Sequence, residues 1–184
     1  QVLAANVDFL FLMTGLDGNY NLRRIERYVT QAWESGAVPV VLLNKSDLCA
    51  DPEGAVAEVR GSVVGVEVYA VCAGDGEGCQ ALSPYLQAGR TIAIVGSSGV
   101  GKSSLANCLV QRRGLVRTSK TPGCTRQVNL FEVTARDGAR CVLADLPGYG
   151  FARRSKDEKK AWAELIESYL TTRPVLRALC ILVD

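Results

Sequence analysis

Two short motifs contain the residue types that a purine nucleotide site needs. Residues 96–103, GSSGVGKS, fit G-x-x-x-x-G-K-[ST], in which glycines let backbone N–H groups turn inward around phosphate oxygens. Residues 44–47, NKSD, fit N-K-x-D, in which the carboxylate accepts hydrogen bonds from N1 and N2 of guanine. The guanine motif ordinarily follows the phosphate motif, yet here it comes about fifty residues earlier. The parts of one site are therefore present in rotated order.

The phosphate motif has the flanks that its chemistry requires. An apolar strand is expected over 91–95 and a helix over 102–111, so that the helix N-terminus presents partial positive charge to phosphate. Lys102 is expected to bridge the β- and γ-phosphates, and Ser103 to bind Mg²⁺. A chance Gly/Ser loop is a poor alternative, because pattern and context agree.

The guanine motif is weaker by itself, since polar turns after strands are common. Its chemical case rests on Asp47, because adenine lacks the donor pair that a carboxylate can accept. Asn44 is expected to tie this loop to the base and to the phosphate loop, while the stem of Lys45 packs over the ring. Cys72-Ala73 looks like the S-A-x segment that contacts guanine O6 through a backbone N–H, with Cys in place of Ser.

A third motif, D-x-x-G at residues 145–148, follows an expected strand over 140–144. Asp145 is predicted to hold Mg²⁺ through a water, and the Gly148 N–H to sense the γ-phosphate. Thr125 is the predicted switch threonine that completes the Mg²⁺ shell, with Thr121 as the alternative; an ordinary Pro-Gly turn competes with both. The predicted catalytic residues are Lys102, Thr125 and Gly148, and the predicted metal ligands are Ser103, Thr125 and Asp145. The predicted nucleotide-binding residues are Asn44, Lys45, Asp47, Cys72, Ala73, Gly96, Ser97, Ser98, Gly99, Val100, Gly101, Lys102, Ser103 and Ser104.

The rest of the chain predicts the elements that position these motifs. Hydrophobic patterns alternate between strands and helices, which favours an α/β fold with a mostly parallel sheet and helices on both faces. Strands are expected at 7–13, 38–43, 63–71, 91–95 and 176–183, with a hairpin of 129–135 and 140–144. Helical segments are expected at 21–35, 55–61, 80–87, 102–111 and 156–172. We interpret the 184 residues as one circularly permuted P-loop GTPase domain, with residues 1–90 reading guanine and 91–184 holding the phosphate loop and switches.

Composition argues against a membrane protein and a zinc protein, and it leaves nucleic-acid binding open. No apolar run reaches the roughly 18 residues that cross a bilayer, so no membrane partner is expected. Seven unpatterned Cys and no His fit reduced thiols in a cytoplasmic protein and disfavour zinc. Residues 1–90 carry 6 Lys and Arg against 11 Asp and Glu, whereas residues 91–184 carry 15 against 8. The basic second half is either a nucleic-acid footprint or a set of solvated helix faces.

Two family resemblances divide the chain. Residues 4–8, 21–28 and 96–105 resemble the GTPase domain of the circularly permuted RsgA/YjeQ family, which acts in assembly of the small ribosomal subunit. Residues 118–123, 145–152 and 162–173 resemble instead the EngB/YsxC/YihA GTPases, which are not permuted and are linked to the large subunit. A natural fusion lineage and an engineered chimera are both open. The resemblance implies GTP and GDP as ligands and a ribosomal subunit or rRNA as partner.

Joining an RsgA-like part to an EngB-like part has a structural consequence. Residues 7–13 and residues 179–184 both match the same strand of a GTPase sheet. The spare strand is expected to add at an edge, fray or exchange with another molecule, giving a strand-exchanged oligomer. For function, slow Mg²⁺-dependent hydrolysis of GTP is expected, because Tyr149 stands where Ras-type enzymes place a water-orienting Gln. The alternative is a guanine-nucleotide-binding scaffold with little turnover. An ATP-dependent enzyme is disfavoured by Asp47.

Overall fold

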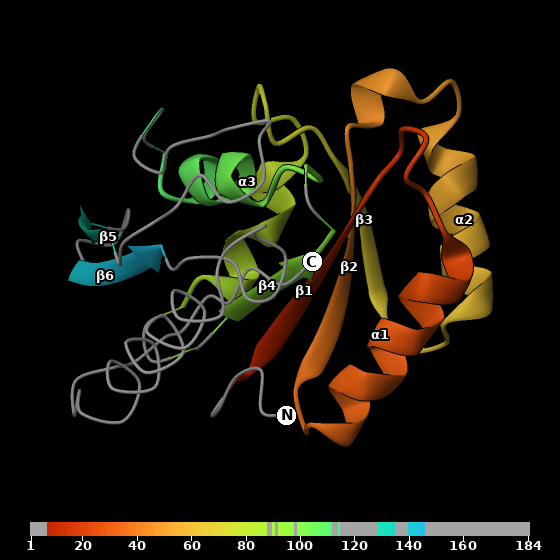
Figure 1. Cartoon of the computed structure of the whole chain (residues 1–184), viewed down its shortest axis with the longest axis horizontal. Helices are drawn as coiled ribbons and strands as arrows, with labels where there is room; N and C mark the ends of the chain where they lie inside the picture. The colour runs from red at the N-terminus through yellow and green to blue at the C-terminus, as the bar shows by residue number, and fades with distance from the viewer. Residues whose placement is uncertain are drawn as a thin grey trace, which may run out of the picture.

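Four parallel strands form the central sheet of the protein. The computed structural model describes residues 7–87, 90, 92–97, 99–111 and 114, and the backbone of 129–134 and 140–145. The strands are β1 (Phe9–Gly15), β2 (Val38–Asn44), β3 (Glu67–Val71) and β4 (Ile92–Gly96), and they lie in the order β3-β2-β1-β4. β4 is thus the neighbour of β1, although β2 and β3 separate the two in the sequence (Figure 1).

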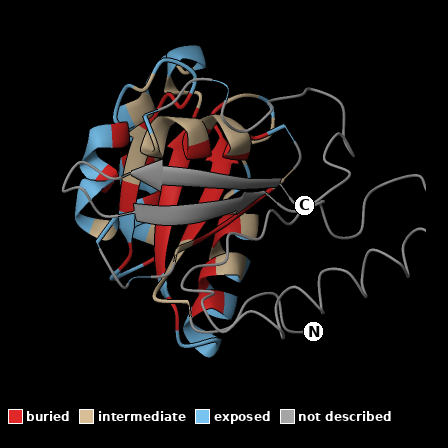
Figure 2. Ribbon diagram, turned by 90° about the vertical axis from the view of Figure 1, so that its left-hand side faces the viewer, coloured by how far each residue is buried: buried red, intermediate tan, exposed pale blue. Residues whose placement is uncertain are grey.

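Helices cover both faces of this sheet. α1 (Leu22–Glu34) and α2 (Pro52–Ser62) lie on one face, whereas α3 (Lys102–Leu109) and the 3₁₀ helix η2 (Cys79–Tyr85) lie on the other (Figure 1). Side chains alternate along β1, so that Leu12 joins the core under α1 and α2 while Phe11 and Met13 join the core under α3 and η2. Figure 2 shows the result, with buried residues concentrated on strands that lie between the two helical layers.

Local sequence signals set the helix starts. Asn21 caps α1, its side-chain oxygen accepting from the backbone N–H of Arg24 at 2.9 Å. Asp51 caps α2 in the same way, accepting from Gly54 N at 2.9 Å, with Pro52 in the first helical position. Both caps begin their helices immediately after the loops that leave β1 and β2, which fixes the length of those loops.

The predicted fold class is confirmed: the sheet is parallel, helices cover both faces, and the strand with the phosphate motif pairs with a strand that precedes the guanine motif. Most of the expected elements in the described part are present within a few residues. The expected strand over 63–71 is wrong at its start, because the chain turns at residues 63–66, where Gly65 has a φ of +78°, and β3 begins at Glu67. The helical segment expected over 80–87 is the 3₁₀ helix Cys79–Tyr85.

A separate hairpin follows the sheet in sequence. β5 (Asn129–Thr134) and β6 (Arg140–Asp145) pair antiparallel, with Asn129 opposite Asp145, as the sequence predicted. The described strands place this pair in its own two-stranded sheet. The helix expected over 156–172 and the strand expected over 176–183 lie outside the described residues.

Candidate functional site

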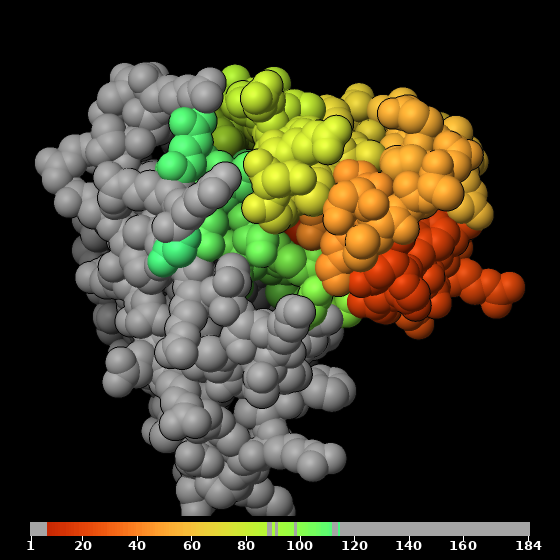
Figure 3. Space-filling view, turned by 90° about the horizontal axis from the view of Figure 1, so that it is seen from above, coloured from red at the N-terminus to blue at the C-terminus, as the bar shows by residue number. Residues whose placement is uncertain are grey.

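The two motifs meet at the carboxyl edge of the parallel sheet. Gly15 lies opposite Asn44 and Asn44 opposite Val71, so β1, β2 and β3 end at one level, and β4 ends two residues earlier, with Gly96 opposite Met13. Figure 3 looks down on this edge, where the orange atoms after β2, the yellow-green atoms after β3 and the green atoms of the phosphate loop and α3 adjoin one another. In open α/β sheets, ligands bind at this edge. This convergence of three loops is the candidate site.

Glycines shape the phosphate loop, residues 97–101. Gly99 and Gly101 have φ of +74° and +102°, a region that L side chains rarely adopt. Gly96 allows the loop to approach β1, because a Cβ there would lie 2.5 Å from the carbonyl oxygen of Met13. Val100 is 1% exposed and anchors the loop in the core under α3. The loop is therefore anchored in the core through Val100, while Ser97 and Gly101 are partly exposed and Gly99 is exposed.

Lys102 lies against the loop that it follows. Its ammonium donates to the carbonyl oxygens of Gly96 and Ser97, the second at 3.1 Å, and the residue is 9% exposed. Ser103 and Ser104 lie beside it in the first turn of α3, both partly exposed. Ser98 is outside the described residues. The lysine is thus placed at the phosphate loop with its charge satisfied by two carbonyl groups.

Asn44 joins three segments of the site. Its side-chain amide donates to the carbonyl oxygen of Val100 at 2.7 Å, and its side-chain oxygen accepts from the N–H of Ala73 at 2.9 Å. The residue is 3% exposed, so both bonds are made away from water. Gly101 is necessary for this bridge, because a Cβ there would lie 2.3 Å from Asn44 Nδ2. One buried amide therefore links the guanine motif to the phosphate loop and to the segment after β3.

Asp47 and Cys72 form the second link on the guanine side. The Cys72 thiol donates to Asp47 Oδ1 at 3.1 Å. Burial, followed by the hydrogen bonds to Asp47 and to Asp75, raises the pKa of Cys72 to about 11. The thiol consequently stays protonated near neutral pH and acts as a donor that orients the carboxylate. The substitution of Cys for Ser in the S-A-x segment keeps this donor.

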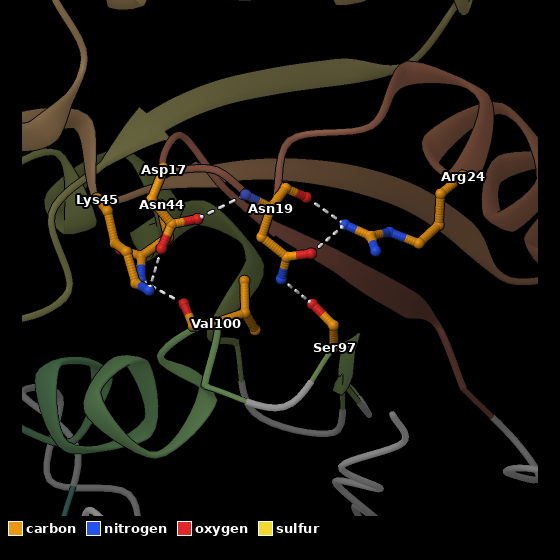
Figure 4. Close-up of polar contacts among 7 residues, drawn as sticks. All are labelled: Asp17, Asn19, Arg24, Asn44, Lys45, Ser97 and Val100. Carbon is orange, nitrogen blue, oxygen red and sulfur yellow. Dashed lines mark hydrogen bonds and ion pairs between the residues drawn. The ribbon is translucent and has the colours of Figure 1, made fainter. Parts of the chain in front are cut away.

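The loop between β1 and α1, residues 16–21, also reaches the site, and no motif had pointed to it. Asp17 Oδ2 accepts from the ammonium of Lys45 at 2.5 Å, and Asn19 Nδ2 donates to Ser97 Oγ at 2.5 Å (Figure 4). The hydrogen bond from Lys45 lowers the pKa of Asp17 below its ordinary value. A signal was present in the sequence, because Asp17 and Asn19 come just after a buried strand, whereas Asn44 ends one.

The remaining predicted residues belong to the second half. Asp145 ends β6, where its backbone pairs with Asn129, and its side chain is not described. Thr121, Thr125 and Gly148 lie outside the described residues. Their roles stay predictions. Among the described side chains, no group of three or more His, Cys, Asp or Glu could hold a metal ion.

The strand order and the convergent loops define the class of protein, a P-loop nucleotide-binding domain with the circularly permuted topology of a GTPase. A family model described as RsgA GTPase matches residues 1–152. The chain therefore belongs to the RsgA GTPase family. No helix in the described part of the chain is long and apolar enough to span a bilayer.

Most of the individual relatives carry the name of this family, and one carries the name EngB. The chain is 54% identical over 151 residues to a protein of Opitutus terrae named small ribosomal subunit biogenesis GTPase RsgA, covering 80% of this chain and 41% of that protein. It is 47% identical over 93 residues, half of this chain and 45% of the relative, to a probable GTP-binding protein EngB of Desulfosudis oleivorans. The crystal structure of YjeQ from Thermotoga maritima matches with a TM-score of 0.55 and 28% identity, over 74% of this chain and 47% of the other. The chain spans less than half the length of each.

Proposed function

We propose that this chain binds GTP and GDP and hydrolyses GTP slowly to GDP and phosphate with Mg²⁺. The observation that carries the proposal is the bridge made by Asn44, which joins the guanine motif to the phosphate loop at 2.7 Å and to Ala73 at 2.9 Å. A base-reading group and a phosphate-binding group must keep a fixed separation to hold one nucleotide. The bridge supplies that fixed separation, and the name of the family agrees with the chemistry.

In the proposed complex each side chain has a separate task. Asp47 accepts from N1–H and N2–H₂ of guanine, and the Cys72 thiol, 3.1 Å away, holds the carboxylate in place. Lys102 leaves the carbonyl groups of Gly96 and Ser97 and donates to the β- and γ-phosphates. Water then attacks the γ-phosphorus, the bond to the β–γ bridging oxygen breaks, and GDP and phosphate are released. Tyr149 in place of a water-orienting Gln makes this step slow.

Magnesium fits the donor set that the described residues provide. Ser103 stands in the first turn of α3, beside Lys102, and offers a hydroxyl oxygen of the hard type that Mg²⁺ accepts together with phosphate oxygens. The ion would neutralise charge that develops on the phosphate oxygens. We propose Thr125, or Thr121, and Asp145 as the other protein groups around it, and Gly148 as the γ-phosphate sensor.

The proposed partner is a ribosomal subunit or its rRNA. The support is the name of the Opitutus terrae relative, small ribosomal subunit biogenesis GTPase, together with 15 Lys and Arg against 8 Asp and Glu in residues 91–184. Such a role places the protein in the cytoplasm. The partner would supply the activation that Tyr149 does not provide.

The second half of the chain carries two further proposals. We propose an EngB-like origin for it, because residues 118–123, 145–152 and 162–173 resemble that family and an EngB-named relative is 47% identical over 93 residues of this chain. We also propose that residues 179–184 exchange between copies, because β1 occupies the sheet position between β2 and β4 that both segments match. Light scattering after size exclusion should then detect a dimer, and deletion of 179–184 should return a monomer.

The test of the proposed function is nucleotide selectivity. Fluorescent GDP bound to the full chain in Mg²⁺ should be displaced by GTP and not by ATP or XTP. Asp47→Asn should shift the preference toward XTP. The NH₂ of the Asn side chain cannot accept from N2–H₂ of guanine, but it can donate to the C2 carbonyl oxygen of xanthine. The control is Asp51→Asn, four residues along, where Asn caps α2 as well as Asp does. Equal displacement by ATP would contradict guanine recognition, and binding without turnover would favour the scaffold alternative.

A further inference from the structure

The loop between β1 and α1 contacts both halves of the proposed site, although it belongs to neither nucleotide-binding motif. Its first residue is fixed to the guanine motif, since the Leu16 N–H donates to the Asn44 carbonyl oxygen at 2.7 Å. Two polar side chains of this loop, Asp17 and Asn19, then point toward the motifs (Figure 4). The inference drawn from these contacts rests on the proposed function of the site.

Asp17 uses both oxygens of its carboxylate. Oδ2 accepts from the Lys45 ammonium at 2.5 Å, and Oδ1 accepts from the Asn19 N–H at 3.1 Å. Gly15 leaves room for this arrangement, because a Cβ there would lie 2.7 Å from Asp17 Oδ1. The carboxylate is thus held by its own loop in the orientation that receives the lysine.

The contacts of Asn19 fix the orientation of its side-chain amide. Arg24, in the first turn of α1, donates to the Asn19 side-chain oxygen at 3.1 Å and also to its carbonyl oxygen. The amide nitrogen of Asn19 must then face Ser97, where it donates to the hydroxyl oxygen at 2.5 Å. Ser97 in turn accepts from the Lys102 ammonium through its carbonyl oxygen, at 3.1 Å. A chain of contacts therefore runs from the guanine motif to the phosphate lysine.

We infer that the loop between β1 and α1 is a positioning element, in which Asp17 orders the Lys45 side chain over the guanine subsite and Asn19 orders Ser97 in the phosphate loop. Lys45 has a φ of +62°, which is unusual for a residue with a side chain and breaks the extended backbone directly after β2. A lysine side chain loses much rotational freedom when it is ordered. Because the ion pair with Asp17 orders Lys45 before a nucleotide arrives, less entropy is lost on binding.

A second ion pair, at the other end of β1, shows what distinguishes Asp17. Asp8, which precedes β1 at the opposite edge of the sheet, pairs with Arg90 at 2.8 Å. The Arg90 side chain is 51% exposed, whereas the side chains of Lys45 and Asp17 are 30% and 28% exposed. Both pairs join an Asp near one end of β1 to a basic residue of another segment. Only the pair with Asp17 lies at the edge where the nucleotide is proposed to bind, so Asp8→Asn is a matched control.

The experiment measures binding of fluorescent GDP and, by competition, of guanosine to the full chain. Asp17→Asn keeps the shape and the acceptor for Asn19 but removes the charge, and Lys45→Met keeps the stem. We expect Asp17→Asn to weaken GDP and guanosine alike by about threefold to tenfold, and to add nothing to Lys45→Met. Asn19→Ala should weaken GDP by a similar factor and leave guanosine unchanged, because Ser97 belongs to the phosphate loop. Asp8→Asn should change neither ligand.

The outcomes separate this inference from the proposed function. Wild-type chain that does not bind GDP would overturn both. Normal GDP binding with unchanged affinity in Asp17→Asn and Asn19→Ala, or effects of Asp17→Asn and Lys45→Met that multiply, would overturn the positioning role alone. Thermal melting of each variant accompanies the titration, because a purely structural role would lower Tm without separating GDP from guanosine. Ser97→Ala, which keeps the backbone of the loop, repeats the Asn19 test, and the pair of changes should not multiply.

Discussion

The guanine side and the phosphate side of the site are built on different principles. On the guanine side, side chains hold one another: Cys72 donates to Asp47, and Asp17 accepts from Lys45. On the phosphate side, the backbone makes most of the contacts: two glycines adopt a positive φ, and Lys102 donates to the carbonyl groups of Gly96 and Ser97. Asn44 is the buried joint between the two.

This difference matches the two parts of the proposed ligand, a guanine nucleotide. A purine edge presents fixed donors and acceptors, which oriented side chains can recognise before binding. Phosphate oxygens carry charge in several directions, which converging backbone N–H groups and one mobile cation accommodate. The guanine side is therefore ordered without a ligand, whereas in the proposed complex Lys102 exchanges its carbonyl partners for phosphate.

The largest expected effect is the loss of the Lys102 charge, which should weaken the binding of a ligand with phosphate and spare one without it. Lys102→Met should weaken GDP binding by about 100-fold or more, because charge-assisted hydrogen bonds to phosphate are each worth about 1.5–3 kcal/mol. Guanosine, which has no phosphate, should bind within about threefold of wild type. Calorimetric titration with both ligands measures this, and equal losses for the two would contradict the division of the site.

The next effect tests the joint between the two sides. Gly101→Ala should lower the free energy of unfolding by about 3 kcal/mol, because it places a side chain at a φ of +102° and a Cβ 2.3 Å from Asn44 Nδ2. Gly99→Ala is the matched change, at a φ of +74° with nothing within 4 Å, and should cost only about 1 kcal/mol. Urea unfolding without nucleotide compares them. Equal costs would show that backbone strain alone matters and that the Asn44 bridge contributes nothing.

A smaller effect tests the preformed guanine side. Cys72→Ala removes the donor to Asp47 and should weaken GDP binding by about threefold to tenfold, in line with the net worth of one hydrogen bond. Cys72→Ser keeps a donor of similar reach, so its GDP affinity should lie within about twofold of wild type. Competition with XTP adds a second measure, because a less oriented carboxylate should select guanine less strictly. Serine and alanine variants that behave alike would argue against the role of the thiol.

The last test of the guanine side is a pH dependence. The pKa of Cys72 is raised from its ordinary value of 9.0 to about 11, so the unfolded chain ionises this thiol at lower pH than the folded chain. The stability that depends on the neutral thiol is fully present below pH 9 and is lost between about pH 9 and 11. Cys72→Ser lacks this titration, and the difference in unfolding free energy between wild type and Cys72→Ser should fall over that interval. A constant difference would contradict the raised pKa.

Some of this architecture could be read from sequence, and particular elements show why. The phosphate loop was predictable because glycine, lysine and serine at fixed spacing, between a strand and a helix, have few other uses. The helix α1 was predictable because its apolar residues recur with helical period and Asn21 caps it. β3 was placed too early, because Val63 and Val66 pack into the core from a turn and so imitate a strand.

The sequence by itself determined which chemistry is present and which loops carry it, since motif spacing and hydrophobic period are local properties. The tertiary structure decided which side chains meet. Asn19 lies 78 residues from Ser97 in sequence, Asn44 lies 56 from Val100, and Asp17 lies 28 from Lys45. These contacts exist because parallel strands bring their carboxyl ends to one edge, whatever the order in which the chain visits them. Rotation of the order changes the connections and leaves that edge intact.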